Sequence, residues 1–299
     1  MTDHGYDSLF RPGLFAGQRA IVTGGGSGIG RCIAHELAAL GAHVCVTGRK
    51  AEKVQGVAAE IAEDGGSATA HAFDIRDEDA VKPAVAAMLE GGPIRYLVNN
   101  AGGQFPSPLQ HISRRGFEAV VSTNLTGGFL VARELFNQSL EKTGGAIVNI
   151  TADFWDGMPV MGHSGAARAG MDNLTKTMAV EWARAGVRVN SVAPGWVASS
   201  GMDQYDPSFS RAMVPEMKRH VPLKRLATEA EISAPVVFLL SDAAAFITGA
   251  GLRVDGGASQ GRPIFPLEDA GHVTRYQGFH RYVPPKAVQE IDQKGKDTP

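Results

Sequence analysis

Short apolar runs alternate with amphipathic stretches along most of the chain. In the first amphipathic stretch, Ile29, Ile33, Leu37 and Leu40 share one helical stripe, and Gly41 stands where the helix would end. Seven apolar runs have the length of buried strands, at 20–22, 43–46, 70–73, 96–98, 146–150, 188–192 and 251–254. Nearly continuous apolar strands that alternate with helices are typical of a parallel sheet with helices on both faces. The pattern therefore predicts an α/β fold built on a doubly wound parallel sheet.

The same alternation defines the expected organisation of the 299 residues. It continues without a linker from residue 15 to residue 258, which predicts a single domain although the length alone would allow two. Residues 1–14 are expected to form an N-terminal arm. Residues 259–299 contain prolines and aromatic residues without periodicity. They are interpreted as a C-terminal tail that wraps this fold or a neighbouring subunit, or that is partly disordered.

Composition and charge exclude several classes of protein. The chain has 29 Lys and Arg, 31 Asp and Glu, a formal net charge of -2 and 43% hydrophobic residues. These values are not those of a disordered chain or of a basic nucleic-acid binder. No apolar run is long enough to cross a bilayer, and the first residues lack the features of an export signal. We therefore predict a cytoplasmic protein that binds neither nucleic acid nor membranes.

The cysteines and histidines do not indicate a metal site. Cys32 and Cys45 are the two cysteines, and both lie in apolar patterns, so they are expected to be buried thiols in reduced form. The histidines are scattered and show none of the spacings of a zinc site, so no metal is predicted.

A glycine-rich loop joins the first predicted strand to the first predicted helix. It reads Gly24-Gly-Gly-Ser27-Gly28-Ile29-Gly30, with the spacing G-x-x-x-G-x-G. Glycine lets the backbone turn tightly and approach a pyrophosphate, and the helix N-terminus offers free N–H groups and a partial positive charge. We therefore predict that Gly24, Ser27, Gly28 and Ile29 bind the phosphates of a dinucleotide.

The end of the second predicted strand indicates which dinucleotide binds. A site selective for NAD carries a carboxylate here for the ribose 2′-hydroxyl. This chain has Arg49 and Lys50 instead. A guanidinium forms charge-assisted hydrogen bonds with a 2′-phosphate, so Arg49 predicts NADP(H) as the cofactor. The alternative is a solvated helix start without a ligand.

Further motifs follow the strands in order: Asn99-Asn100-Ala101-Gly102 after the fourth, Asn124 beyond it, and Pro194-Gly195 after the sixth. Together with the glycine loop, they resemble the short-chain dehydrogenase/reductase family over about residues 15–258. The resemblance implies a Rossmann-type single domain that transfers hydride to or from a nicotinamide, commonly as a homotetramer. It also implies a set of cofactor contacts: Asp74 and Ile75 with the adenine, Asn100, Ala101 and Gly102 with the ribose, and Pro194, Gly195, Val197 and Ser199 on the nicotinamide side.

The catalytic helix departs from the family's pattern. Family members usually place Tyr and Lys four residues apart, but here Ser164 and Arg168 occupy those positions, while the family's Asn is retained as Asn124. The spacing still puts both side chains on one helix face toward the cofactor. Arg168 stays protonated and can anchor ribose hydroxyls, but neither it nor a serine readily gives a proton to an alkoxide. Simple carbonyl reduction would therefore need His163 or Asp153 as the acid.

Reduction of a conjugated carbon–carbon double bond suits these residues better. Negative charge then gathers on a thioester oxygen as an enolate, which neutral donors such as Ser164, Asn124 and backbone N–H groups can stabilise. Water or His163 would protonate the α-carbon. The segments 99–108 and 163–176 also resemble peroxisomal trans-2-enoyl-CoA reductases and, less closely, 2,4-dienoyl-CoA reductases. This resemblance implies an acyl-CoA-like substrate. The chain ends in Asp297-Thr-Pro299, without a peroxisomal tripeptide.

Two other functions remain open. One is a short-chain alcohol or 3-hydroxyacyl dehydrogenase with an unusual proton donor, and the other is a dinucleotide-binding protein without catalysis. Residues 200–225 stand where the family has a mobile lid. Their apolar side chains could cover an acyl chain and their cations could meet CoA phosphates, or the segment could be an ordinary amphipathic surface helix.

Overall fold

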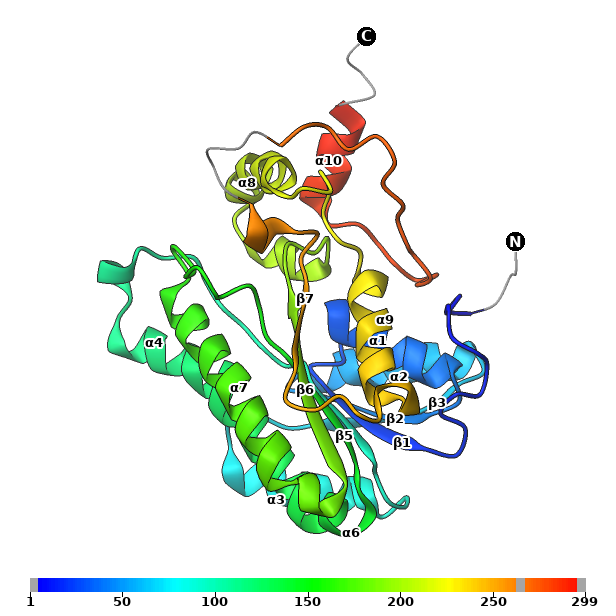
Figure 1. Cartoon of the computed structure of the whole chain (residues 1–299). Helices are drawn as coiled ribbons and strands as arrows, with labels where there is room; N and C mark the ends of the chain where they lie inside the picture. Colours follow the sequence, from blue (N-terminus) through cyan, green and yellow to red (C-terminus); the bar gives the residue numbers. More distant parts are fainter. Residues whose placement is uncertain (1–4, 262–266, 295–299) are drawn as a thin grey trace.

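The computed structural model describes residues 5–261 and 267–294. Its sheet contains seven strands: β1 (Arg19–Thr23), β2 (His43–Gly48), β3 (Ser67–Ala72), β4 (Tyr96–Asn99), β5 (Gly145–Ile150), β6 (Val187–Pro194) and β7 (Gly251–Val254) (Figure 1). The α-helices are α1 (Gly28–Ala39), α2 (Ala51–Glu63), α3 (Glu78–Leu89), α4 (Arg114–Val121), α5 (Gly127–Leu135), α6 (Glu141–Thr143), α7 (Gly162–Glu181), α8 (Pro207–His220), α9 (Glu229–Leu240) and α10 (Lys286–Lys294). Among these described helices, none is both long and apolar enough to cross a membrane.

The sheet confirms the predicted α/β doubly wound fold. Its strands lie in the order β3-β2-β1-β4-β5-β6-β7, and every pairing is parallel. The largest error in the predicted strands is at β3, which starts at Ser67 rather than at residue 70. β3 is an edge strand without a fully buried residue, so its first residues form no apolar run. The crossover between β1 and β4 creates the switch point at which such sheets bind ligands.

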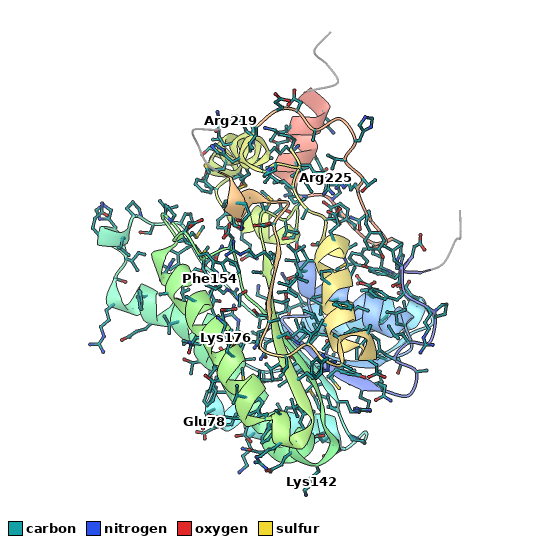
Figure 2. All side chains as sticks on the ribbon, in the orientation of Figure 1. Glu78, Lys142, Phe154, Lys176, Arg219 and Arg225 are labelled. Carbon is teal, nitrogen blue, oxygen red and sulfur yellow. The ribbon has the colours of Figure 1, made fainter. Side chains whose placement is uncertain are left out.

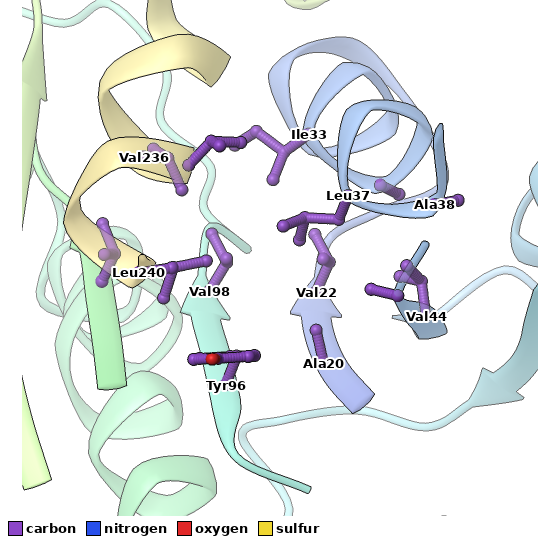
Figure 3. Close-up of a cluster of buried hydrophobic side chains, with 14 of the residues drawn as sticks. Ala20, Val22, Ile33, Leu37, Ala38, Val44, Tyr96, Val98, Val236 and Leu240 are labelled. Atoms are coloured by element: carbon purple, nitrogen blue, oxygen red, sulfur yellow. The ribbon is translucent and has the colours of Figure 1, made fainter. Parts of the chain in front are cut away.

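Apolar clusters cover both faces of the sheet. On one face, α1, α2 and α9 pack against alternate strand residues, and Figure 3 shows Leu37 of α1 beside Val22 of β1 and Leu240 of α9 beside Val98 of β4. On the other face, α3, α5 and α7 pack against the intervening residues, such as Ile21. Successive strand residues thus serve opposite faces, which is why the strands read as continuous apolar runs. Both cysteines are buried and free, as predicted.

The N-terminal arm and the C-terminal tail pair with each other. The Asp7 N–H donates to the Gly278 carbonyl at 2.9 Å. Phe279 is 2% exposed and packs between Tyr6 and His35, with ring centroids 5.8 and 5.1 Å away. Residues 1–4 of the predicted arm and residues 262–266 and 295–299 of the predicted tail lie outside the described residues. The described part of the tail packs against this chain's own domain.

The described part of the tail ends in α10, beside α8 (Figure 1). Its residues Ala287, Val288 and Ile291 pack against Val214 of α8 and Leu226. Sequence patterns do not predict this helix, although its three apolar residues share one helical stripe, because nine residues are shorter than the window over which a helical period is recognised. The last helix therefore depends on the surface that it covers.

Candidate active site

The glycine loop lies between β1 and α1, at the switch point of the sheet. Gly24 and Gly28 have φ angles of +64° and +57°, which residues with a side chain rarely adopt. A Cβ on Gly30 would run into the Asn100 amide and the Gly24 carbonyl. Within the described structure, the Ser27 side chain caps no N–H of α1, so the first N–H groups of this helix lack a side-chain partner. An anionic pyrophosphate fits these donors.

A hydrogen-bond network joins this loop to the end of β4. The Thr23 hydroxyl oxygen accepts from the main-chain N–H groups of Asn100 and Ala101, at 3.0 Å each. Asn100 Nδ2 donates to the Thr23 carbonyl at 2.9 Å. A Cβ on Gly24 would lie 2.8 Å from Ala101 Cα, so the two segments meet through bare backbone. The structure thus brings together the segments predicted to bind phosphate and ribose.

Arg49 is exposed after β2, and Asp74 follows the adjacent β3. Asp74 forms an ion pair of 2.5 Å with Arg76. Arg76, and to a smaller extent Arg49, hold the pKa of the Asp74 carboxyl below its usual range. Among the described residues, Arg49 forms no ion pair of its own. The Ile75 side chain is buried in the core against Gly127, which leaves its main chain for a contact with adenine.

The segment after β6 approaches the loop from the other side. β6 ends at Pro194, and a Cβ on Gly195 would lie 2.8 Å from the backbone of the segment after β7. Val197 is held by a parallel bridge to the segment before α9. A Cβ on Gly28 would lie 3.9 Å from the Ser199 Cβ, so this segment borders the glycine loop.

Glu229, the first residue of α9, borders the same loop. It is 5% exposed, and a Cβ on Gly28 would lie 3.8 Å from its Oε1. The Ser200 N–H donates to its carboxyl, and burial raises the pKa of this carboxyl to about 7. Sequence patterns do not single out Glu229, because an acidic residue is common in the first turn of a helix.

Asn124 lies on a π-helical turn, Ser122–Thr126, between α4 and α5. Such turns occur frequently at functional sites. Asn124 Oδ1 accepts from the Gly103 N–H at 2.9 Å, and Nδ2 donates to the Gly103 carbonyl at 3.0 Å. The same Nδ2 donates to Ser164 Oγ at 3.4 Å. Both N–H groups of the amide are thus engaged, so Asn124 orients Ser164.

Ser164 and Arg168 lie one turn apart on α7, as their spacing predicts. Arg168 Nη1 donates to the Ile150 carbonyl at 2.5 Å, and Nη2 lies against the backbone of Gly102. Arg168 Nε is buried without a hydrogen-bond partner among the described residues. Burial lowers the pKa of this guanidinium to about 10. A buried guanidinium with an unused donor fits a ligand that brings hydroxyl oxygens, such as a ribose.

Gln104 and Tyr205 extend the hydrogen bonds of Ser164. Ser164 Oγ donates to Gln104 Oε1 at 2.6 Å, and Gln104 Nε2 donates to the Tyr205 hydroxyl at 3.3 Å. Tyr205 follows a 3-10 turn, Ser200–Gln204, and precedes α8. The sequence presents Gln104 inside a family-like segment and Tyr205 in the segment 200–225, where the resemblance places a lid. It contains no signal that joins them to Ser164, because these contacts span 60 and 101 residues.

His163 is fully buried beside Ser164. Its Nδ1 accepts from the Ser164 N–H at 3.0 Å, and its Nε2 has no hydrogen-bond partner among the described residues. Phe105 stands edge-on to the imidazole, with ring centroids 4.5 Å apart. Asp153, the other residue considered as an acid, is half-buried after β5, and burial together with Asp255 raises the pKa of its carboxyl.

Exposed apolar side chains border this site. Phe105, Leu109 and Val160, here called the apolar wall, are all exposed. The Ser107 N–H donates to the Val160 carbonyl at 2.8 Å, and a Cβ on Gly162 would lie 2.9 Å from Leu109 Cδ1. The apolar wall therefore links the loop after β4 with the start of α7. It begins at Phe105, whose ring contacts His163.

The cations of residues 200–225 are engaged within the chain. Three arginines pair with carboxylates: Arg211 with Glu290 at 3.3 Å, Arg219 with Glu216 at 2.6 Å and Arg225 with Glu231 at 2.6 Å. Figure 2 shows Arg219 and Arg225 at the α8 end of the molecule. Met202 and Met217 of this segment pack in the cluster that includes α10. Much of the segment therefore serves its own attachment.

A family model and a curated relative match most of the chain. Residues 24–259 match the model described as "Enoyl-(Acyl carrier protein) reductase". A protein of Bacillus subtilis named as a probable 2,4-dienoyl-CoA reductase is 37% identical over 244 residues, which cover 79% of this chain and 94% of that protein.

Two solved structures are similar to this one. A citronellol catabolism dehydrogenase from Pseudomonas aeruginosa PAO1 is 62% identical, with a TM-score of 0.77, and the match covers 85% of this chain and 100% of that one. A protein of Beutenbergia cavernae assigned as an NAD(P)-dependent gluconate 5-dehydrogenase, with NADP bound at low occupancy, is 36% identical. Its TM-score is 0.78, and the match covers 84% of this chain and 100% of that one.

Proposed function

This chain is an oxidoreductase of the short-chain dehydrogenase/reductase family, and we propose that it transfers hydride from NADPH to the double bond of a 2-enoyl-CoA thioester. The observation that carries this proposal is the Asn124 amide donating to the Ser164 hydroxyl at 3.4 Å, one helical turn from Arg168. Neutral donors of this kind stabilise a delocalised oxyanion. The phenol and ammonium groups with which the family usually protonates an alkoxide are replaced by Ser164 and Arg168.

The residues present fit a bound dinucleotide. The bare-backbone loop with its free helix N–H groups suits a pyrophosphate, and the unpaired Arg168 Nε suits a ribose hydroxyl. We assign the contacts as follows: Gly24, Ser27, Gly28 and Ile29 to the pyrophosphate, Arg49 to the 2′-phosphate, Asp74 and Ile75 to the adenine, Asn100, Ala101, Gly102 and Arg168 to the ribose, and Pro194, Gly195, Val197 and Ser199 to the nicotinamide amide. Bound NADPH supplies the hydride.

Replacing Arg49 with alanine is expected to weaken NADPH binding at least about tenfold while changing NADH binding little. The reason is the loss of charge-assisted hydrogen bonds to the 2′-phosphate, a group that NADH lacks. Fluorescence titration of both cofactors against wild type and Arg49→Ala measures the two dissociation constants. Equal losses for the two cofactors would contradict the assignment of NADPH.

Ser164 is the group that we assign to the substrate oxygen. As negative charge develops on the thioester oxygen, the Ser164 hydroxyl would donate to that oxygen. Asn124 Nδ2 would at the same time donate to Ser164 Oγ and fix its position. The α-carbon would take its proton from water or from His163, whose Nε2 has no other partner among the described residues. Arg168 would hold the ribose and take no part in proton transfer.

The apolar wall supports an acyl substrate. Phe105, Leu109 and Val160 offer exposed apolar surface that starts beside His163 and Ser164. An acyl chain laid on this surface would bury apolar area at about 25 cal/mol per Å². A polyhydroxylated sugar acid would leave its hydroxyls unpaired there, which disfavours a gluconate-type substrate.

A second candidate function is the oxidation of an apolar primary alcohol. It is favoured by the 62% identity to a citronellol catabolism dehydrogenase and by the same apolar wall. This reaction needs a base for the hydroxyl proton, and His163 or Asp153, considered above as the acid of carbonyl reduction, would act as that base in the reverse direction.

Turnover assays distinguish these functions. Oxidation of NADPH would be followed with crotonyl-CoA and with longer 2-enoyl-CoAs, and reduction of NADP⁺ with citronellol and shorter alcohols. Turnover of enoyl-CoAs is expected, and turnover restricted to alcohols would replace the first function with the second. Binding of NADPH without turnover of either class would indicate a dinucleotide-binding protein without catalysis.

We also propose that the protein forms a homotetramer, with exposed apolar residues in its interfaces. Phe246 is fully exposed, and Leu252 lies exposed on the edge strand β7. Val180 of α7 is 79% exposed. The loop before β7 reaches the same end of α7, since a Cβ on Gly249 would lie 3.5 Å from the Cβ of Ala179. Phe246→Asp is expected to lower the mass in sedimentation equilibrium to that of a dimer or monomer. A wild-type protein that sediments as a monomer would contradict the proposal.

A further inference from the structure

Residues 200–225, here called the lid, are connected to Ser164 by two successive hydrogen bonds that the proposed mechanism does not use. Tyr205 accepts from Gln104 Nε2 at 3.3 Å, and Gln104 Oε1 accepts from Ser164 Oγ at 2.6 Å. A serine hydroxyl has a single proton. While that proton is donated to Gln104, Ser164 presents only lone pairs to a substrate oxygen and cannot stabilise negative charge on it.

The two hydrogen bonds between Tyr205 and Ser164 can run in either direction, because the primary amide of Gln104 both donates and accepts. Turning the Gln104 amide by half a rotation exchanges its oxygen and nitrogen, which have similar size and opposite hydrogen-bonding roles. The Tyr205 hydroxyl then donates to the amide oxygen, the amide nitrogen donates to Ser164 Oγ, and the Ser164 proton is free for the substrate. A phenol suits both directions because its hydroxyl both accepts and donates.

The position of Tyr205 depends on the lid and on the C-terminal tail. Its ring lies 6.0 Å from that of Phe209 of α8, between centroids. Two residues before it, Asp203 Oδ1 accepts from the main-chain N–H of Lys286 at 2.9 Å, at the start of α10. α10 lies beyond residue 259, where the match to the family model ends. The turn that precedes Tyr205 is thus attached, through Asp203, to an element outside the matched part of the chain.

We propose that Tyr205 is a positioning residue that acts through Gln104, so that Ser164 donates to the substrate only while the Tyr205 hydroxyl donates to the Gln104 amide oxygen. This inference rests on the proposed role of Ser164 but not on the identity of the substrate. It applies equally to an enoyl thioester and to an alcohol, because both place an oxygen at Ser164.

A double-mutant cycle on whichever substrate is turned over tests the proposal. Tyr205→Phe is expected to lower kcat about tenfold, with a smaller change in KM and unchanged NADPH affinity, because one directed hydrogen bond is lost. In a Ser164→Ala background, the same change is expected to lower kcat no further. Losses that multiply in the double variant would show that Tyr205 acts independently of Ser164 and would overturn the proposal.

The pH profile of Gln104→Glu provides a readout that a purely structural role would not move. An ionised carboxylate only accepts, so it holds the Ser164 proton and kcat should fall at pH 8. Below the pKa of the introduced carboxyl, the protonated group can donate as the amide does, so kcat should recover relative to wild type as pH falls. Gln104→Leu should show no recovery. A profile of Gln104→Glu that parallels that of wild type would contradict the proposal.

A third measurement needs no turnover. Hydrogen–deuterium exchange of residues 200–213 in the NADPH-bound protein should rise in Tyr205→Phe and in Gln104→Leu by similar amounts. Tyr276→Phe is the matched control, because the Tyr276 hydroxyl donates to the Asp7 carbonyl at 2.8 Å and not to any of residues 200–213. Unchanged exchange in both test variants would show that the contact does not hold the lid, and would overturn the proposal even if no substrate is found.

Discussion

Replacing Ser164 with alanine is expected to lower kcat about a hundredfold and to leave the dissociation constant of NADPH nearly unchanged. A group that donates to a developing oxyanion contributes most in the transition state, and removal of one such donor typically costs about a hundredfold or more in rate. Ser164 contacts Asn124 and Gln104, whereas the predicted pyrophosphate site lies on the glycine loop. Cofactor binding and turnover should therefore separate in this variant.

Single-turnover kinetics with a 2-enoyl-CoA, together with a fluorescence titration of NADPH, provide the two measurements. Ser67→Ala is a matched control, because Ser67 bonds only to His43 at the start of β3, as far as the described residues show. This control should retain wild-type kcat. An unaffected kcat in Ser164→Ala would remove Ser164 from the mechanism, and a parallel loss of NADPH affinity would indicate a structural role instead.

Replacing Phe279 with alanine is expected to lower the free energy of unfolding by about 3 kcal/mol, as for other large buried rings. Phe279 belongs to a buried cluster with Cys32 of α1 and Ala230 of α9, and the Arg31 guanidinium lies 5.0 Å from its ring centroid. A cavity at this position would loosen the contact of the tail with the helix that follows the glycine loop. Urea unfolding followed by circular dichroism measures the change.

Val283→Ala is the control for this experiment. Val283 lies four residues further along the same tail but is 68% exposed, so its truncation should change the free energy of unfolding by less than about 0.5 kcal/mol. A Phe279→Ala variant as stable as wild type would show that the tail contributes little to the stability of the domain in solution.

The sequence predicts the sheet because a strand that is buried on both faces needs apolar side chains at successive positions. Strands such as β1 and β5 are buried on both sides and read as apolar runs, and α1 is apolar on one stripe. Elements that are only partly buried lack such apolar runs and are predicted less well. The first residues of β3 lie on an exposed edge, and α10 is only nine residues long, so its apolar stripe is too short to indicate a helix.

The candidate site divides in the same way. The glycine loop and the pair Ser164 and Arg168 could be predicted, because each set lies within a few residues and its geometry follows from one turn or one helix. The sequence could not predict that Arg168 Nε is buried without a hydrogen-bond partner among the described residues, since this depends on packing by distant segments. Glu229, next to Gly28, is equally silent in the sequence.

The sequence by itself determined the alternation of strands and helices, the glycine loop between β1 and α1, and the serine and arginine that replace the family's usual pair. Only the tertiary structure decided that Gln104 and Tyr205 reach Ser164 and that the tail packs Phe279 against α1. The physical reason is the range of the interactions: periodicity and turn chemistry act over a few residues and are written along the chain. A hydrogen bond between residues 101 positions apart exists only because the sheet and its helices bring their segments together.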